Sequence, residues 1–437
     1  MERTTYLRTA VIYQMFLRAF DERGTIRAAT EHLGEIAALG ADIIYLCPFV
    51  QHDSSQDPAN FSERMKKSGL PNPRNPYRLS DYYQIDPEYG CDADFEAFVK
   101  QAHALGMRVM MDLVYLHCGP AASFLVDHPN FARHNEDGSI MLTSFGFPIL
   151  DFTQPDLREY LLDNMLYFVR RFDIDGYRCD CGDMIPLDFW AEGVRRIRAE
   201  RPDFVMLNEG DHFEALEEVF DLNYGSPWLW WMTEHLRGRA GAEKVRDAYR
   251  RICMPDGISC RNILSLENHD YVNDAYDDRI EKTVPVGAIE GAFLLTALLP
   301  GTMFLYNGEE YADTARHSIM GCRENAPGLC IDRSRVQTAE AQHRYAFLRT
   351  LIGLRHTLPV VREGDFAWRA EESEALVFER NCGGQTLFAA ANLTREKMTV
   401  AVPNPTENAK ILLQREAVLS GSSLILPPHS YMALLWE

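Results

Sequence analysis

The sequence contains no hydrophobic run long enough to cross a membrane as a helix. The longest apolar stretch, residues 291–306, is interrupted by Thr296, Pro300, Gly301 and Thr302. It is also shorter than the ~20 residues that a membrane-spanning helix needs. The chain does not open with an apolar signal-like stretch. We therefore expect no membrane association and a cytoplasmic location.

Basic residues are scarce, with 44 Lys and Arg against 64 Asp and Glu, which gives a formal net charge of −20. Such an excess of negative charge disfavours binding to nucleic acid or to an anionic membrane surface. It is compatible with a neutral ligand such as a carbohydrate. Hydrophobic residues make up 46% of the chain, so it can build a sizeable core.

The ten cysteines form no recognisable metal-binding pattern. Cys179 and Cys181 are two residues apart on one expected strand and have no matching second pair, which disfavours zinc. In a chain without a secretion signal we expect free thiols in a reducing cytosol. The sequence predicts no metal and no cofactor, and it leaves the oligomeric state open.

Buried strands alternate with amphipathic helices from the start of the chain to about residue 360. The expected strands are Val11–Phe16, Asp42–Pro48, Arg108–Tyr115, Gly176–Asp180, Phe204–Glu209, Val219–Asn223, Asn262–Glu267 and Met303–Tyr306. Helical spacing of apolar residues occurs in Ala29–Leu39, Ala93–Leu105, Leu157–Arg171 and Trp190–Glu200. Eight such units favour a closed parallel (β/α)8 TIM barrel over an open doubly wound sheet.

Two long segments interrupt this alternation. Residues 51–78 are rich in Pro, Asn, Ser and charge and follow the second strand, and residues 118–149 form a short irregular insert after the third. Loops this long are usually functional. From about Glu363, short alternating segments indicate an all-β ending. The expected organisation is a catalytic barrel over 1–117 and 150–362, a reduced insert over 118–149, and a C-terminal β-sandwich domain over 363–437.

Four segments that close expected strands carry acidic and basic groups: residues 112–117, 176–180, 207–210 and 267–270. The carboxyl ends of barrel strands converge on one face. Cleavage of a glycosidic bond needs an acid for the leaving oxygen and a second carboxylate for the sugar carbon, about 5 Å apart in a retaining enzyme. Neighbouring strands lie about 4.8 Å apart, so carboxylates that end them meet this requirement.

Asp180 and Glu209 end the fourth and fifth expected strands. Arg178 lies two residues before Asp180 and points to the same side, which favours an ionised, nucleophilic Asp180. Partial burial of Glu209 near other carboxylates raises the pKa of its carboxyl, as an acid catalyst requires. Asp270 and His117, at two further strand ends, are candidates for binding sugar hydroxyls.

Each of these groups also has a purely structural explanation. Asp180 could cap a helix, Glu209 could be a solvated loop residue, and Arg178 could form a structural ion pair. Asp112, early on its strand, is expected to brace the barrel or Arg178. Because the structural explanations would have to hold together at four ordered strand ends, a functional site is favoured.

The four segments resemble the motifs of the α-amylase family, which are D-x-V-x-N-H, G-x-R-x-D, a strand-ending E and N-H-D, in that order. Flanking segments are similar as well, at residues 11–14, 40–49, 81–87 and 301–310. This resemblance implies a retaining glycosidase or transglycosidase that acts on α-glucans. By position it implies Asp180 as the nucleophile, Glu209 as the general acid/base and Asp270 as the transition-state stabiliser. It further implies that four residues hold the donor sugar: Tyr77, His117, Arg178 and His269.

Several positions depart from the family pattern. Leu116 replaces an Asn, and Ile149 an Asp, that ordinarily help to bind a structural calcium ion, and calcium needs six to eight oxygen ligands. The resemblance therefore implies that the usual calcium site is missing. Asn75 replaces a histidine of the donor site, and residues 181–184 lack the Lys-His pair that contacts acceptor sugars in amylases.

These observations lead to one primary hypothesis and two alternatives. The primary hypothesis is a cytosolic retaining α-glycosidase that hydrolyses α-1,4 or α-1,6 bonds of maltooligosaccharides or small α-glucosides. The first alternative is a transglycosidase or sugar isomerase that uses the same covalent intermediate. The second, a non-catalytic binding protein, is disfavoured because all three acidic residues are present. Trp228, Trp230 and Trp231 could stack on acceptor sugars or pack in the core.

Overall fold

Eight short parallel strands form the central sheet of the computed structural model, which describes residues 3–253, 260–272 and 278–437. The strands are β1 (Val11–Met15), β2 (Ile43–Leu46), β3 (Arg108–Leu113), β4 (Gly176–Cys179), β5 (Val205–Asn208), β6 (Leu222–Asn223), β7 (Ile263–Leu264) and β8 (Thr302–Tyr306). β1 pairs with both β2 and β8, and a parallel bridge between Asn223 and Asn262 joins β6 to β7. The sheet therefore closes into the expected TIM barrel.

The strands are buried along their whole length in β1, β2, β4 and β5. Helices cover the outer face of a parallel sheet and side chains fill the barrel, so neither face of the sheet contacts solvent. That is why these strands appear in the sequence as continuous apolar runs, close to their expected bounds. β6 and β7 are shorter than expected, because Val219 and Phe220 precede β6 and β7 ends at Leu264.

The helices follow the apolar spacing of the sequence. The expected helices are present as α6 (Asp92–Ala104), α8 (Pro155–Phe172) and α9 (Leu187–Glu200). The single helix expected over 29–39 is wrong: α3 (Ile26–Glu31) and α4 (Leu33–Leu39) are separated by His32. The other barrel helices are α1 (Arg3–Leu7), α2 (Leu17–Phe20), α10 (Phe213–Glu218), α11 (Ser226–Leu236), α12 (Ala242–Ile252), α13 (Ile280–Thr283), α14 (Val286–Leu298) and α15 (Ala339–Thr357).

The two long segments lie at the carboxyl ends of β2 and β3. The segment 51–78 is more than a loop, because it contains the short helix α5 (Glu63–Lys67). The insert 118–149 contains α7 (Phe124–Asp127), and antiparallel bridges such as Leu142 to Pro148 fold it into a hairpin-like arm. Both segments contribute residues to the cavity described below.

After α16 (Pro359–Glu363) the C-terminal region consists of β-strands and one short 3-10 turn, Thr406–Asn408. Five antiparallel strands form one sheet: β9 (Ala367–Arg369), β10 (Leu376–Cys382), β11 (Gln385–Asn392), β13 (Lys410–Arg415) and β16 (Ser430–Trp436). A second sheet contains β12 (Met398–Ala401), β14 (Val418–Ser420) and β15 (Ser423–Leu426). Buried side chains of both sheets, such as Phe388 and Leu424, share a separate core, so the sheets pack as a sandwich.

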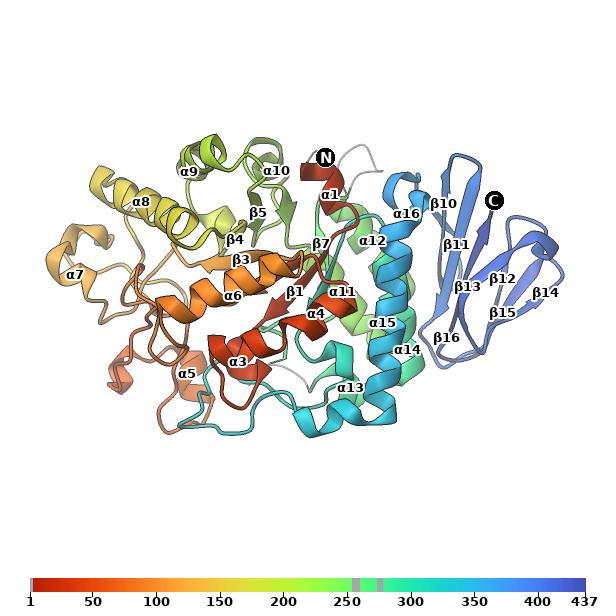
Figure 1. Ribbon diagram of the computed structural model, residues 1–437, viewed down its shortest axis with the longest axis horizontal. Helices are drawn as coiled ribbons and strands as arrows, with labels where there is room; N and C mark the ends of the chain where they lie inside the picture. The colour runs from red at the N-terminus through yellow and green to blue at the C-terminus, as the bar shows by residue number, and fades with distance from the viewer. Residues whose placement is uncertain (1–2, 254–259, 273–277) are drawn as a thin grey trace.

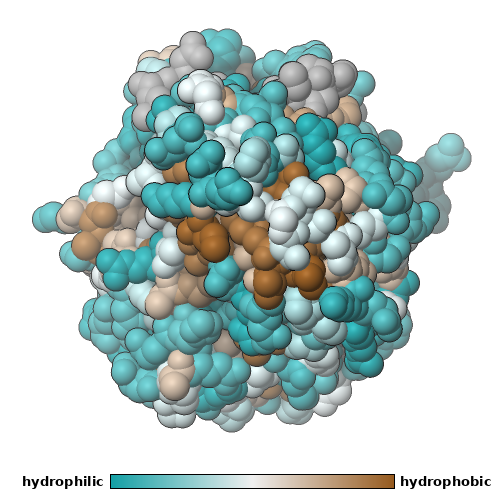
Figure 2. All heavy atoms as spheres, turned by 90° about the vertical axis from the view of Figure 1, so that its right-hand side faces the viewer, coloured by the Kyte–Doolittle hydropathy of each residue, from teal (hydrophilic) through white to brown (hydrophobic). Residues whose placement is uncertain are grey.

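Helix α14 lies between the barrel and this sandwich (Figure 1) and packs on β11 and β16. It is apolar on all sides for that reason, except for Glu290. The buried carboxylate of Glu290 accepts a hydrogen bond from Tyr431 Oη at 3.1 Å and pairs with Arg415 at 3.0 Å. On the outward face of the sandwich, apolar side chains gather near the centre of the view in Figure 2. Among the described residues, no helix is long and apolar enough to cross a membrane.

Candidate active site

The carboxyl ends of the barrel strands open into a cavity of about 780 Å³. Five of the seven predicted site residues line it: Tyr77, His117, Asp180, Glu209 and Asp270. The other two, Arg178 and His269, are fully buried beneath them. The structure therefore brings together residues that are spread over nearly two hundred positions of the chain.

Arg178 is the cation around which the acidic groups gather. It lies near the end of β4, and its Nη1 atom is 2.8 Å from an oxygen of Asp112 and 2.8 Å from an oxygen of Asp180. Its Nη2 atom lies 2.7 Å from Glu209 Oε1. The guanidinium carbon also lies 5.8 Å from the ring centroid of Tyr77 and 5.4 Å from that of Tyr224. One buried arginine thus fixes three carboxylates, including Asp112 as the expected brace.

Asp180 and Glu209 immediately follow β4 and β5. One carboxylate oxygen of Asp180 lies within 4.8 Å of one carboxylate oxygen of Glu209. Such a short separation of the two carboxyl groups is typical of retaining glycosidases. The turn after β4 contributes as well, because Cys181 has a left-handed φ of 47° and its N–H donates to Glu209 Oε2 at 2.7 Å. Such a conformation is unfavourable for a residue other than glycine, and here it orients a donor toward the carboxylate.

Burial raises the pKa of the Asp180 carboxyl well above its usual value, and repulsion from Glu209 adds to this effect. Burial also raises the pKa of Glu209, against the opposing effect of Arg178. Because the two carboxyls share one cation, they titrate as a pair. Both shifts favour the protonated form, so the pair binds a proton more readily than isolated carboxyls do, and Arg178 does not by itself keep Asp180 ionised as the sequence predicted.

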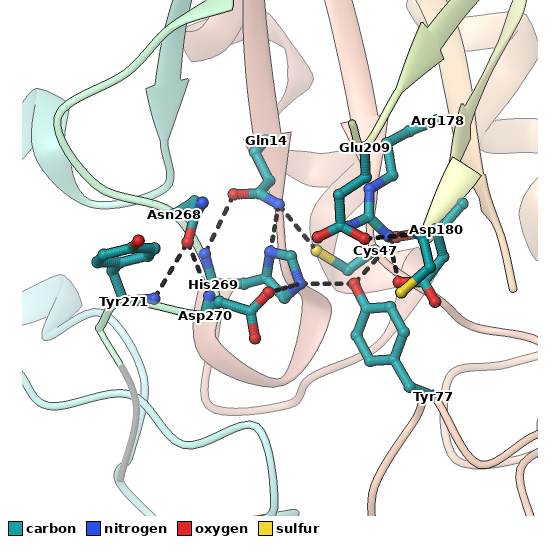
Figure 3. Close-up of polar contacts among 12 residues, drawn as sticks. Gln14, Cys47, Tyr77, Arg178, Asp180, Glu209, Asn268, His269, Asp270 and Tyr271 are labelled. Atoms are coloured by element: carbon teal, nitrogen blue, oxygen red, sulfur yellow. Dashed lines mark hydrogen bonds and ion pairs between the residues drawn. The ribbon is translucent and has the colours of Figure 1, made fainter. Parts of the chain in front are cut away.

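On the other side of the cavity, Asp270 lies beside His269 (Figure 3). The backbone N–H of His269 donates to Gln14 Oε1 at 3.2 Å, so the Gln14 amide nitrogen faces His269 Nδ1, 2.7 Å away. Burial lowers the pKa of His269 to about 4, so the imidazole is neutral and Nε2 carries the hydrogen. Nε2 then donates toward Tyr77 Oη at 2.6 Å and lies 3.4 Å from Asp270 Oδ2.

Tyr77 connects the two sides of the site. Its hydroxyl donates to Asp112 Oδ2 at 3.0 Å, and its ring stacks on His269 with centroids 5.4 Å apart. Tyr45 also donates to Asp112 Oδ2, at 2.5 Å. His117 lies below, where its Nε2 contacts the Tyr77 carbonyl at 3.1 Å and burial lowers its pKa to about 4.

Two of the predicted site residues, Asp270 and His117, lie beyond the ends of their strands. β7 ends at Leu264, so Asp270 lies in the following loop and not at a strand end as expected. Likewise β3 ends at Leu113, four positions before His117. Of the tryptophans, Trp228 is buried in the core, whereas Trp230 is 44% exposed and lies edge-on to Tyr271, which lines the cavity.

Three residues of the site had no role in the sequence prediction. The sequence could have indicated a role for Gln14, because it is a polar residue inside an otherwise apolar strand. Tyr45 had none, since aromatic residues are common in strands. Arg64 of α5 contacts Asp270 at 3.1 Å, and no local pattern links a loop arginine to a site two hundred residues later.

The residues of the family's usual calcium site do not fit calcium here. The Leu116 side chain is buried, and its carbonyl oxygen accepts a hydrogen bond from Leu150 N–H at 3.0 Å. Ile149 forms an antiparallel bridge with His117. Both positions offer apolar side chains in place of the oxygen ligands that calcium requires. The prediction that the protein needs no metal stays a prediction.

A closed parallel barrel with paired carboxyls at the ends of neighbouring strands has the architecture of a glycoside hydrolase. A family model described as the alpha-amylase catalytic domain matches residues 14–138. A cyclomaltodextrinase from Geobacillus thermopakistaniensis is 25% identical over 94% of this chain and 70% of its own length. An intracellular maltogenic amylase from Bacillus subtilis is 29% identical over 44% of this chain and 34% of its own length.

Solved structures are similar over nearly the whole fold. An α-amylase from Lactobacillus plantarum superposes with a TM-score of 0.80 at 24% identity, covering 99% of this chain and 100% of its own. The α-amylase from Geobacillus thermoleovorans in complex with acarbose has a TM-score of 0.77 at 23% identity, covering 99% of both chains. The family-model match, the curated relatives and the order of the motifs identify the chain as a glycoside hydrolase of the α-amylase family, and the solved structures show that it has the same fold.

Proposed function

We propose that the protein is a retaining α-glycosidase that hydrolyses α-1,4 or α-1,6 bonds of maltooligosaccharides or small α-glucosides. The observation that carries this proposal is the Asp180–Glu209 pair, whose oxygens lie within 4.8 Å at the ends of β4 and β5. That distance leaves no room for a water molecule to attack from the far side of the sugar, so it favours double displacement over inversion.

In the first step, Asp180 attacks the anomeric carbon while Glu209 gives its proton to the leaving oxygen. The bond to the leaving sugar breaks and a glycosyl ester with Asp180 forms. In the second step, Glu209 takes a proton from water, and the resulting hydroxide equivalent attacks the same carbon and releases Asp180. Arg178 stays in contact with both carboxyls throughout and offsets the negative charge on whichever is ionised.

The remaining predicted residues bind the donor sugar or orient its binding groups in this proposal. Asp270 stabilises positive charge on the sugar ring in the transition state. The neutral His117 hydrogen-bonds a sugar hydroxyl, and Tyr77 stacks under the apolar face of the sugar. His269 was expected to bind the sugar as well, but Gln14 and Tyr77 occupy both of its ring nitrogens, so it acts by orienting Tyr77 and Asp270. The substrate class is supported by the relatives, which are named cyclomaltodextrinase and maltogenic amylase. A cytoplasmic location is supported by the relative named intracellular.

Transfer to a second sugar is the alternative, because the same intermediate serves both reactions. The exposed Trp230 beside Tyr271 favours it, since an aromatic surface at the cavity wall suits an acceptor sugar. Product analysis separates the two outcomes. Free reducing sugar alone at high maltotriose concentration supports hydrolysis, whereas longer or rearranged glucosides support transfer.

The experiment that tests the proposal traps the intermediate. The Glu209→Gln variant is incubated with 5-fluoro-α-glucosyl fluoride, which reacts without an acid. The masses of the protein and of its proteolytic peptides are then measured by mass spectrometry. A gain of one fluoroglucosyl group on the peptide that contains Asp180 is expected, and Asp180→Asn should show no gain. If both variants hydrolyse aryl α-maltosides at the wild-type rate, the proposal is wrong.

A further inference from the structure

Arg64 reaches Asp270 from outside every segment that resembles the family motifs. Its Nη1 atom donates to Asp270 Oδ1 at 3.1 Å, and its Nη2 atom lies 3.4 Å from the Asp270 backbone oxygen. Arg64 and Asp270 both line the cavity. Their side chains are 32% and 29% exposed, respectively. The contact therefore joins the 51–78 segment to the loop after β7 at the reaction site.

The helix that carries Arg64 is firmly held. Ser62 caps α5 by accepting a hydrogen bond from Met65 N–H at 3.2 Å, and the Met65 side chain is buried. Beneath it, Arg78 contacts Met65 Sδ at 3.7 Å and forms a buried ion pair with Asp53 at 2.8 Å. Arg64 thus projects from an anchored turn, which limits where its guanidinium can lie.

Both oxygens of Asp270 have a fixed neighbour as a result. Arg64 holds Oδ1, and His269 Nε2 lies 3.4 Å from Oδ2. Asp270 also repels the Glu209 carboxylate, since it raises the pKa of that group. Arg64 places a positive charge in direct contact with Asp270. Although burial acts to raise the pKa of Asp270, His269 and Arg64 outweigh it and the net pKa is lowered.

We propose that Arg64 is a positioning residue that keeps Asp270 oriented toward the donor sugar in its ionised form. This inference rests on the proposed function. The role acts through Asp270, whose own contribution is made in the transition state. Loss of Arg64 should therefore lower kcat more than it raises KM. Residues that orient a catalytic or ligating group typically contribute about 10- to 100-fold to activity.

The test is a double-mutant cycle of Arg64→Met and Asp270→Asn. Hydrolysis of an activated aryl α-glucoside is measured, because its good leaving group keeps residual rates measurable. We expect Arg64→Met to lower kcat about 10- to 100-fold in the wild-type background and less than about twofold in the Asp270→Asn background. Arg64→Lys, which keeps the charge but loses the second contact, should fall between wild type and Arg64→Met.

The matched control is Arg27→Met, because Arg27 is an exposed arginine that pairs with Asp94 at 2.9 Å and neither residue lines the cavity. It should retain wild-type kcat. Equal losses from Arg64→Met in both backgrounds, or a rise in KM with kcat unchanged, would overturn the inference. If Arg64→Met does not fold, the same double-mutant cycle is measured with Arg64→Lys, and equal losses of kcat in both backgrounds would again overturn the inference. Wild-type activity in Asp270→Asn alone would instead refute the role of Asp270 in the proposed function.

Discussion

Asp180 and Glu209 contact the two terminal nitrogens of a single guanidinium, that of Arg178, at 2.8 and 2.7 Å. Because both distances are set by one rigid planar group, the separation of the two carboxyls is fixed without a direct contact between them. The same nitrogen that binds Asp180 also binds Asp112. The geometry needed for double displacement therefore depends on a residue that does not line the cavity.

Arg178→Lys should abolish most activity and destabilise the fold. A lysine presents one nitrogen and cannot keep the fork that spaces Asp180 and Glu209, so buried carboxylates lose a partner. We expect the free energy of unfolding in urea to fall by about 3 kcal/mol or more. The control is Arg170→Lys, whose exposed side chain pairs with Glu200 and which should unfold like wild type. Unchanged kcat in Arg178→Lys would contradict this account.

Asp180→Asn should be inactive but more stable than wild type at neutral pH. Burial raises the folded-state pKa of Asp180, so ionisation of this group destabilises the fold as pH rises above about 4, its unfolded-state value. The amide removes that cost, by about 1 kcal/mol. The gain should therefore be present at pH 7, shrink as the pH falls, and vanish about one unit below the unfolded-state pKa, where the acid is protonated in both states.

Thermal unfolding at several pH values between 4 and 8 measures this effect. Asp127→Asn, at an exposed position of α7, should show no such pH-dependent gain. A stability difference between wild type and Asp180→Asn that is constant with pH would show that ionisation of Asp180 is not its origin.

Tyr77→Phe should lower kcat/KM about tenfold, because the buried hydroxyl that joins His269 to Asp112 is lost while the ring remains. The free energy of unfolding should fall by only about 1 kcal/mol, since Asp112 keeps Arg178 and Tyr45. Steady-state kinetics on an aryl α-glucoside measures the effect. Tyr83→Phe, which loses a hydrogen bond to the Tyr160 carbonyl away from the cavity, serves as control and should retain activity.

Neither calcium nor its removal should change the melting temperature. The positions where the family places calcium-binding oxygens hold Leu116 and Ile149. The Leu116 carbonyl accepts a hydrogen bond from Leu150, and the backbone of Ile149 is paired with Arg133 and Met141 of the insert. Differential scanning calorimetry with EDTA and with added CaCl₂ measures this directly. A melting temperature that falls in EDTA and recovers with calcium would reveal a calcium site formed by other residues.

The sequence predicted the barrel strands well where both faces of the strand are buried, as in β1 to β5 and β8. It predicted β6 and β7 too long, because only Leu222–Asn223 and Ile263–Leu264 pair in the sheet, and the buried residues Val219 and Leu266 beside them lie outside the strands. It also missed the break at His32, since the apolar spacing of residues 29–39 continues across it. Propensity and spacing do not report where a helix turns to follow a curved barrel.

The seven predicted site residues lie in or directly beneath one cavity, and Asp112 contacts Arg178 as expected, whereas no other partners were predicted for His269, Asp112 or Asp270. Gln14 and Tyr45 act through contacts with His269 and Asp112 that join different strands. Arg64 lies in the segment 51–78, and the length of this loop was the only feature of the sequence that indicated a function for it.

The amino-acid sequence by itself determined that charged groups would follow successive buried strands, and so that they would meet at one end of a barrel. This follows from local chemistry, because apolar runs form core strands and the parallel arrangement aligns their ends. Only the tertiary structure decided that Arg178 spaces the two carboxyls and that α5 places a second arginine on Asp270. Those contacts depend on how distant segments pack, and packing at that precision is not encoded in any short stretch of residues.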